Sequence, residues 1–447
     1  MTGGRFPGWP LLVVLLDGLA DWPCRELDGA TPLEAAPTPN LDRIAAGGAT
    51  GLCYPLGPGR APSSERAQWR YLGYDDDVFP GRAALEAAGA GVPVAAGDVC
   101  SNLALRTAEA DAGHLRLVGS YGRDDDPDAP ELLQALDGAV GDFSFSVRYV
   151  QRAEGLLTVS GPSVSPDVSD ADPFSAGQHV HRVEPLDEAW DPLGAMRTAA
   201  ALNTFLLRAH RVLEEHPLNR RRRAAGISPL NAVVTKWTGR LREVTPLPAQ
   251  VGGPATVVAS AGLYTGLARV TGAQVRQVPA HPDAATELAS KVEQGLDAVA
   301  GGAAFVYIHS KAPDEAGHRH DPAAKAEVIA ACDRGLAGLV DLADCVVAVT
   351  ADHGTPSWGP VLHSGDAVPL AVRGPTVRVD AVERFDERVV AAGGLGTIRG
   401  NDLLPLLVDA AGRARFTGCR HGRRLSIAAP TDTALLQLDS DEPDETA

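Results

Sequence analysis

Three short runs of apolar residues, each followed by polar residues, constrain the fold of this chain more than any other feature. The runs are Leu11–Leu16, Ala304–His309 and Cys345–Thr350. Continuous apolar runs of this length are typical of strands that are buried on both faces of a parallel sheet. Residues Ala323–Leu342, between the second and third runs, have the apolar spacing of a helix. Strand, helix and strand at this spacing predict an α/β fold with a mostly parallel sheet flanked by helices.

Each of the three runs leads into residues that can bind a metal ion. Asp17 follows the first run, Asp314 and His318 follow the second, and Asp352 with His353 follows the third. The carboxyl ends of parallel strands meet at one edge of a sheet, which is where open α/β sheets bind ligands. We therefore expect these side chains to lie close together at one edge.

The complete candidate set contains three aspartates, three histidines and one serine hydroxyl. Asp314 and His318 are four residues apart, so a helical turn would place them on one face, as two ligands of one metal require. Carboxylates mixed with imidazoles suit manganese or zinc. A metal-bound serine hydroxyl has a lowered pKa and can attack a phosphoryl group. Any one of these residues has a simpler structural explanation, but together they predict a site with two divalent cations. The candidates are Asp17, Ser64, Asp314, His318, Asp352, His353 and His363.

Composition limits the possible partners and the compartment. The formal net charge of −17 argues against a nucleic-acid-binding protein, since such proteins carry a basic face. Two bound cations would still allow an acidic protein to bind a phosphorylated metabolite or a phosphonate. The six cysteines are scattered, which favours reduced thiols in a cytoplasmic protein. The run Leu11–Leu16 is too short for a membrane span, and Asp17-Gly18 ends it, so we expect no membrane contact. The oligomeric state is not predictable from these features.

The middle of the chain differs in character from both ends. It contains loops rich in Asp, Gly and Pro, and one long helical pattern over Pro192–His216. The basic run Arg220–Arg223 is either a solvated helix end or an edge that attracts anions. The acidic tail, residues 431–447, is expected to be disordered, since its last residues, Asp439–Ala447, have no apolar anchor.

Several further stretches resemble one enzyme family. The metal motifs and the segments at 27–36, 72–75, 86–91, 216–219, 363–369 and 393–396 are similar to archaeal-type cofactor-independent phosphoglycerate mutases, members of the alkaline phosphatase superfamily. The resemblance implies a catalytic domain in two segments, residues 1–84 and 249–430, with a smaller α/β domain inserted at 85–248. It also implies that Ser64 is the nucleophile that becomes phosphoserine. One metal would be held by Asp17, Ser64, Asp352 and His353, and the other by Asp314, His318 and His363.

Departures from the family pattern fall at positions that would hold the substrate. An arginine and an asparagine expected after Gly97-Asp98-Val99 are absent, and a lysine expected to face the phosphoserine is Thr265. The remaining candidates for substrate contact include aromatic residues, which would suit a larger or flatter ligand by stacking. The alternative is that the aromatic residues pack at a domain interface. The candidates are Arg152, Lys236, Arg269, Lys311, Trp69 and Trp237, with Tyr121 as a further aromatic residue near a replaced position.

These departures lead to three hypotheses about function. The first is a di-metal phosphoryl-transfer enzyme with a phosphoserine intermediate that acts, as a hydrolase or transferase, on a phosphoester or phosphonate other than phosphoglycerate. The second is a true phosphoglycerate mutase in which Arg152, Lys236 and Arg269 replace the missing arginines. The third is a non-catalytic metal-binding relative. We expect the first, because a mutase must grip a small dianionic glycerate and arginine forks are the best groups for that task.

Overall fold

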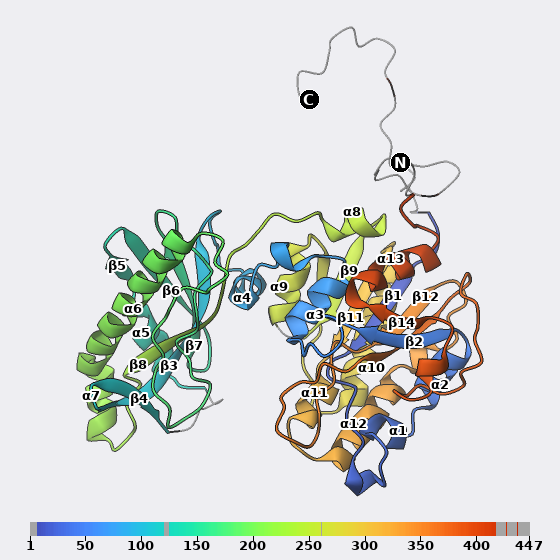
Figure 1. Cartoon of the computed structure of the whole chain (residues 1–447), viewed down its shortest axis with the longest axis horizontal. Coiled ribbons are helices and arrows are strands. Elements are labelled where there is room, and N and C mark those ends of the chain that lie inside the picture. The colour runs from blue at the N-terminus through green and yellow to red at the C-terminus, as the bar shows by residue number, and fades with distance from the viewer. Residues whose placement is uncertain (1–6, 120–124, 261, 417–425, 427–435, 437–447) are drawn as a thin grey trace. The chain divides into compact units, whose positions relative to one another are not determined.

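The computed structural model describes every residue of the chain except 1–6, 120–124, 261, 417–425, 427–435 and 437–447. The chain divides into two compact units (Figure 1). The larger unit contains residues 1–75, 246–259 and 278–447, and the smaller unit contains residues 76–245 and 260–277. Tyr121 lies outside the described residues. The expected tail at 431–447 also lies outside them, except for Leu436.

The larger unit is built on a mostly parallel sheet with the strand order β10-β9-β11-β1-β12-β13-β2-β14, in which the edge strand β10 comes from residues 274–277 of the segment grouped with the smaller unit. The central strand β1 pairs in parallel with both β11 and β12, while β13 runs antiparallel to β12 and to β2. This confirms the predicted fold class. The strands are β1 (Leu11–Leu16), β2 (Ala49–Tyr54), β9 (Ala255–Ala259), β10 (Gln274–Gln277), β11 (Phe305–Ser310), β12 (Val346–Thr350), β13 (Val368–Arg373) and β14 (Gly396–Arg399).

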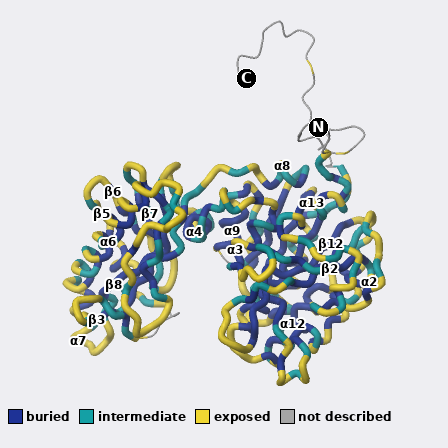
Figure 2. The backbone as a smooth tube through the Cα atoms, in the orientation of Figure 1, coloured by how far each residue is buried: buried dark blue, intermediate teal, exposed yellow. Residues whose placement is uncertain are grey.

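Burial explains why the predicted strands are continuously apolar. All six residues of β1, all six of β11 and all five of β12 are buried, because helices cover both faces of the sheet (Figure 2). The helices of this unit are α1 (Pro32–Ala35), α2 (Pro39–Ala46), α3 (Ser64–Tyr71), α8 (Leu247–Val251), α10 (Ala284–Ala300), α11 (Ala312–Gly317), α12 (Pro322–Gly335) and α13 (Gly400–Ala410). The helix expected at Ala323–Leu342 is divided into α12 and a short 3₁₀ turn at Ala337–Leu339.

The smaller unit is an antiparallel sheet with one long helix against it. The strand order is β4-β3-β7-β6-β5, and β8 pairs with β3 on its other edge. The expected long helix is confirmed as α6, and its buried face packs on the sheet with Phe205 stacked on Phe145 at 4.6 Å between ring centroids. The elements are β3 (Val99–Asp111), β4 (His114–Val118), β5 (Gly138–Val140), β6 (Phe143–Gln151), β7 (Glu154–Ser160), β8 (Ala232–Gly239), α4 (Arg82–Ala90), α5 (Ala129–Gln134), α6 (Pro192–Glu215), α7 (Pro217–Ala224) and α9 (Gly262–Val270).

The unit boundaries differ from the expected ones in one informative way. Helix α9 belongs with the smaller unit, although its position in the sequence lies among the segments of the larger one. It packs closely on α4, because Gly89 and Gly266 leave no room for side chains at the contact. A Cβ atom at Gly266 would lie 1.8 Å from the carbonyl oxygen of Leu85, and one at Gly89 would lie 1.9 Å from that of Gly262. A larger residue at either glycine would force the two helices apart.

Candidate active site

The nucleophile candidate Ser64 lies at the start of α3, directly after its N-cap Ser63. Its side chain is buried, and the Oγ atom lies 3.0 Å from Nε2 of His353. It donates a hydrogen bond to Oδ1 of Asp17 at 3.3 Å and lies 3.4 Å from Nζ of Lys311. A serine at this position is held by the helix start, with its hydroxyl surrounded by charged groups and candidate metal ligands.

The first cluster of ligand atoms consists of Asp17, Asp352 and His353, all fully buried at the ends of β1 and β12. One ligand atom from each lies within 4.8 Å of the others. Asp352 accepts a hydrogen bond from the backbone N–H of Gly18 at 3.0 Å and one from Nε2 of Gln68 at 3.1 Å. These bonds orient the carboxylate toward the strand ends.

The second cluster consists of Asp314 and His318, from the α11 segment, and His363. Oδ1 of Asp314 lies 3.2 Å from Nε2 of His318 and 3.5 Å from Nε2 of His363. The rings of His363 and His353 stack with centroids 3.7 Å apart, so the two clusters adjoin. The predicted seven residues are therefore brought together at the carboxyl edge of the sheet.

Hydrogen bonds made by the Nδ1 atoms leave Nε2 of two histidines unprotonated, as a metal ligand must be. Nδ1 of His363 lies 2.8 Å from the carbonyl oxygen of Pro62, which can only accept, so Nδ1 carries the proton. The hydroxyl of Thr355 donates to Asp314 at 2.6 Å and therefore accepts from Nδ1 of His353 at 3.1 Å. Such partners fix the tautomer that metal-ligating histidines need.

The electrostatics of the site also fit bound cations. Burial lowers the pKa of His353 to about 3, which keeps it neutral as a ligand must be. Burial, followed by the negative charge of Asp17, raises the pKa of Asp352 well above its usual range. Burial alone would also raise the pKa of Asp17, but Lys311 and a hydrogen bond from His309 hold it below its usual range. Three buried carboxylates this close repel one another unless positive charge lies between them, and divalent cations would supply that charge.

Lys311 is the predicted substrate residue that does lie in this site. Its Nζ atom is 3.0 Å from Oδ2 of Asp17 and 2.8 Å from Oδ2 of Asp314, so it bridges the two clusters. Gln68, His309 and Thr355 also lie at this site and are not among the residues predicted from the sequence. Gln68 lies four residues after Ser64 on the same helix, so helical spacing was a usable signal for it.

The structure does not support two of the other expected substrate contacts. Trp69 is completely buried, stacks on Tyr74 with centroids 4.5 Å apart and donates its indole N–H to the carbonyl oxygen of Asp75. It is a core residue and not a ligand platform. Arg269 donates to the carbonyl oxygens of Ala88 and Gly89, where it caps the end of α4.

The remaining expected contacts lie in the smaller unit. Lys236 is buried and pairs with Glu154 at 3.2 Å and with Asp172 at 3.7 Å, so the protein neutralises its charge internally. Trp237 is half-buried, and the guanidinium of Arg82 lies 4.1 Å from its ring centroid. Arg152 is exposed at the turn between β6 and β7. Arg152, Lys236 and Arg269 were expected to replace the missing arginines. Of these three, only Arg152 is exposed and makes no side-chain hydrogen bond or ion pair among the described residues.

This fold and site define the chain as a metal-dependent phosphoryl-transfer enzyme of the alkaline phosphatase superfamily. The model of the 2,3-bisphosphoglycerate-independent phosphoglycerate mutase family matches residues 45–219. The enzyme of that name from Methanopyrus kandleri is 40% identical over 422 residues, which cover 91% of this chain and 98% of that protein. The one from Pyrococcus horikoshii is 35% identical and is covered to 98%. The chain belongs to this family.

Solved structures agree with the assignment. A protein from Pyrococcus horikoshii has a TM-score of 0.75 at 28% identity, with 92% of this chain and all of that chain covered. The cofactor-independent phosphoglycerate mutase from Thermoplasma acidophilum has a TM-score of 0.65 at 28% identity, with 90% of this chain covered. Within the described residues, no helix is long and apolar enough to span a membrane.

Proposed function

We propose that this enzyme interconverts 2- and 3-phosphoglycerate through a phosphoserine at Ser64. The observation that carries the proposal is the position of the Ser64 hydroxyl beside two adjoining clusters of ligand atoms, in a chain that matches named mutases over nearly their whole length. The hypothesis of a different substrate, which we expected from the sequence, has no support from the comparisons, since the relatives named above that have an assigned activity are phosphoglycerate mutases.

We assign two divalent cations, manganese or zinc, to the two clusters. One is assigned to Asp17, Ser64, Asp352 and His353, and the other to Asp314, His318 and His363. The mixture of carboxylate and imidazole donors fits these metals. Cations bound there would lower the pKa of the serine hydroxyl and offset the negative charge of the phosphoryl oxygens.

The residues of the chain then perform a two-step transfer. Ser64 Oγ attacks the phosphorus atom of the substrate, the bond from phosphorus to the glycerate oxygen breaks, and that oxygen takes up the proton that the Ser64 hydroxyl releases. The other glycerate hydroxyl then attacks the phosphoserine, which restores the free Ser64 hydroxyl. Lys311, which lies 3.4 Å from Ser64 Oγ, is placed to stabilise negative charge as the phosphoryl group passes. Arg152 is the exposed cation that remains to hold the glycerate carboxylate.

The decisive test is conversion of 3-phosphoglycerate coupled to enolase, with purified protein and manganese. We expect robust activity that Ser64→Ala abolishes while the protein stays folded and metal-loaded. Wild-type protein that binds metal but converts no phosphoglycerate would refute the proposal.

A second candidate is phosphoryl transfer from another small phosphoester or a phosphonate. The pairing of Lys236 with Glu154 and Asp172 favours it, because this cation is not free to grip a glycerate carboxylate without breaking a buried ion pair. If the mutase assay fails, a panel of phosphoesters and phosphonates assayed with the same Ser64→Ala control tests this candidate.

A further inference from the structure

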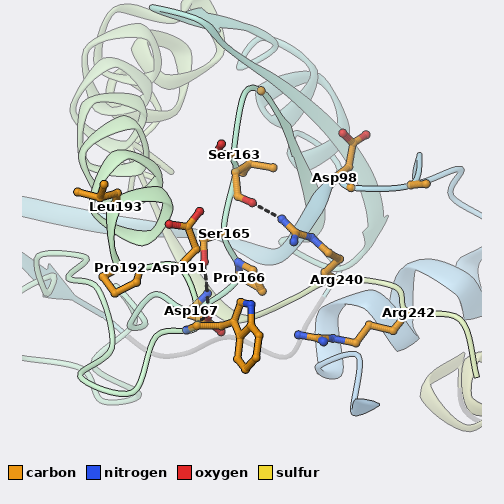
Figure 3. A pocket seen from close by; sticks show the side chains of 15 residues that line it. Asp98, Ser163, Ser165, Pro166, Asp167, Asp191, Pro192, Leu193, Arg240 and Arg242 are labelled. Atoms are coloured by element: carbon orange, nitrogen blue, oxygen red, sulfur yellow. Dashed lines mark hydrogen bonds between the residues drawn. The ribbon is translucent and has the colours of Figure 1, made fainter. Parts of the chain in front are cut away.

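The smaller unit contains a pocket that is separate from the metal-ligand clusters. It has a volume of about 810 Å³ and is lined by the segment 96–98 before β3, the segment 161–167 after β7, the start of α6, and two arginines after β8 (Figure 3). A pocket of this size suits a small metabolite. Its lining includes none of the positions that were expected to contact phosphoglycerate.

Two guanidinium groups of the pocket form no ion pair with the residues that the structure describes. The side chains of Arg240 and Arg242 extend toward the segment that carries Ser163 and Asp167 (Figure 3). Arg240 donates a hydrogen bond to the carbonyl oxygen of Val164, but its Nε atom is buried without a hydrogen-bond partner. Burial and then the positive charge of Arg242 lower the pKa of Arg240. In the described part of the chain, neither guanidinium has a carboxylate oxygen within 4.0 Å.

Two of the carboxylates that line the pocket are already used by the backbone. Asp191 caps α6 by accepting from the N–H of Gly194 at 3.0 Å, and Asp167 accepts from the N–H of Trp190 at 3.0 Å. They shape the wall of the pocket. Together with Asp98 they are carboxylates whose charges favour the protonated form of Arg240, although none of the three forms an ion pair with it in the described part of the chain.

Two other cations of the same unit are held in ion pairs. Arg222 pairs with Asp126 at 3.0 Å and with Asp128 at 2.8 Å, and Lys236 pairs with Glu154. These partners make Arg222, within the basic run at 220–223, part of a structural network. The guanidinium groups of Arg240 and Arg242, which form no such ion pairs among the described residues, instead offer a forked set of hydrogen-bond donors to an anion in the cavity.

The pocket also exposes a large aromatic side chain. Trp190 is 94% exposed, although its backbone is fixed by Asp167 and by the start of α6. An indole left in water keeps a large apolar surface unburied. A fixed backbone and a free ring together provide a face on which a flat ligand can stack.

We propose that this pocket binds a small ligand that carries an anionic group attached to a flat ring system, the chemical class to which nucleoside monophosphates belong. Arg240 and Arg242 hold the anionic group, and the ring stacks on Trp190. The site is independent of the proposed mutase reaction, because no residue of the metal clusters lines it.

Calorimetric titration of the full-length, manganese-loaded protein with AMP tests the proposal, with adenosine and inorganic phosphate as the two half-ligands. We expect saturable binding of AMP that is tighter than that of either half-ligand. Arg242→Gln should weaken AMP binding about tenfold or more, because it removes charge-assisted hydrogen bonds. Trp190→Ala should weaken it about tenfold by removing a stacked base.

Arg211→Gln is the matched control, since Arg211 is an exposed arginine on α6 outside the pocket. Unchanged AMP affinity in this control, with losses in both pocket variants, supports the site. The proposal is overturned if AMP does not bind. It is also overturned if AMP binds equally well to both pocket variants, because AMP would then bind at the metal clusters. A Trp190→Ala variant with unchanged AMP affinity would overturn it as well, because the ring would then play no part in recognition.

Discussion

Replacing Lys325 should show how strongly one buried cation holds the active-site loops in place. Its side chain is completely buried on α12, and Nζ contacts Oδ2 of Asp21 at 3.0 Å. The same atom donates to the carbonyl oxygens of Ala20 at 3.1 Å and Thr355 at 2.8 Å. Asp21 in turn accepts from the N–H of Ser357. One ammonium group therefore joins the loop after Asp17 to the loop after His353.

The substitution Lys325→Met keeps the length of the side chain and removes its charge. It leaves the buried Asp21 carboxylate and two buried carbonyl groups without their partner. Breaking a buried ion pair by removing one member costs about 3–5 kcal/mol. We expect a loss of this size in the free energy of unfolding, measured by urea denaturation, together with weaker manganese binding, because both loops carry metal-ligand candidates.

The surface pair Arg43–Asp341 is the control for this reasoning. Its nitrogen–oxygen distance of 2.7 Å is shorter than that of the Lys325 pair, but both side chains are largely exposed. Exposed pairs contribute about 0–1 kcal/mol. If Arg43→Met destabilises the protein as much as Lys325→Met, or if Lys325→Met leaves both stability and manganese affinity unchanged, then burial is not what gives the Lys325 network its importance.

Three further predictions concern titration, metal removal and the protein core. Burial raises the pKa of Glu387 to about 7, so the folded state favours its protonated form, and stability should decline as the pH rises from about 4.5 through 7. Glu387→Gln should remove up to about 3 kcal/mol of that decline in the free energy of unfolding. Curves of unfolding free energy against pH that run parallel for the two proteins would contradict this. Removing divalent cations with a chelator should lower the melting temperature, because a cation present at about 100 times its Kd stabilises the fold by about 2.7 kcal/mol; the same Tm with and without chelator would argue against resident metals. Trp69→Ala should cost about 3–5 kcal/mol in denaturation experiments, as expected of a core aromatic residue, whereas Trp237→Ala at a half-buried position should cost less.

Much of the larger unit could be predicted from sequence because its determinants are local. A run such as Leu11–Leu16 is apolar at every position only where both faces of a strand are buried, and the observed strand has the predicted bounds. The residues that follow such strands must meet at one sheet edge, which is why Asp17, Asp314 and Asp352 could be grouped before any coordinates were known. The long helix α6 was likewise readable from its periodicity.

Other features depended on contacts between residues far apart in the chain. Trp69 and Lys236 looked like substrate contacts from their sequence positions, but one is in the core and the other is neutralised by Glu154 and Asp172. Thr355 and Lys325 have ordinary sequence surroundings, and their roles arise from partners up to 305 residues away. The chain order alone therefore determined the fold class and the candidate metal ligands. Only the tertiary structure decided which charges are already paired and which, like Arg240 and Arg242, remain available to a ligand, because pairing depends on distances that local sequence does not encode.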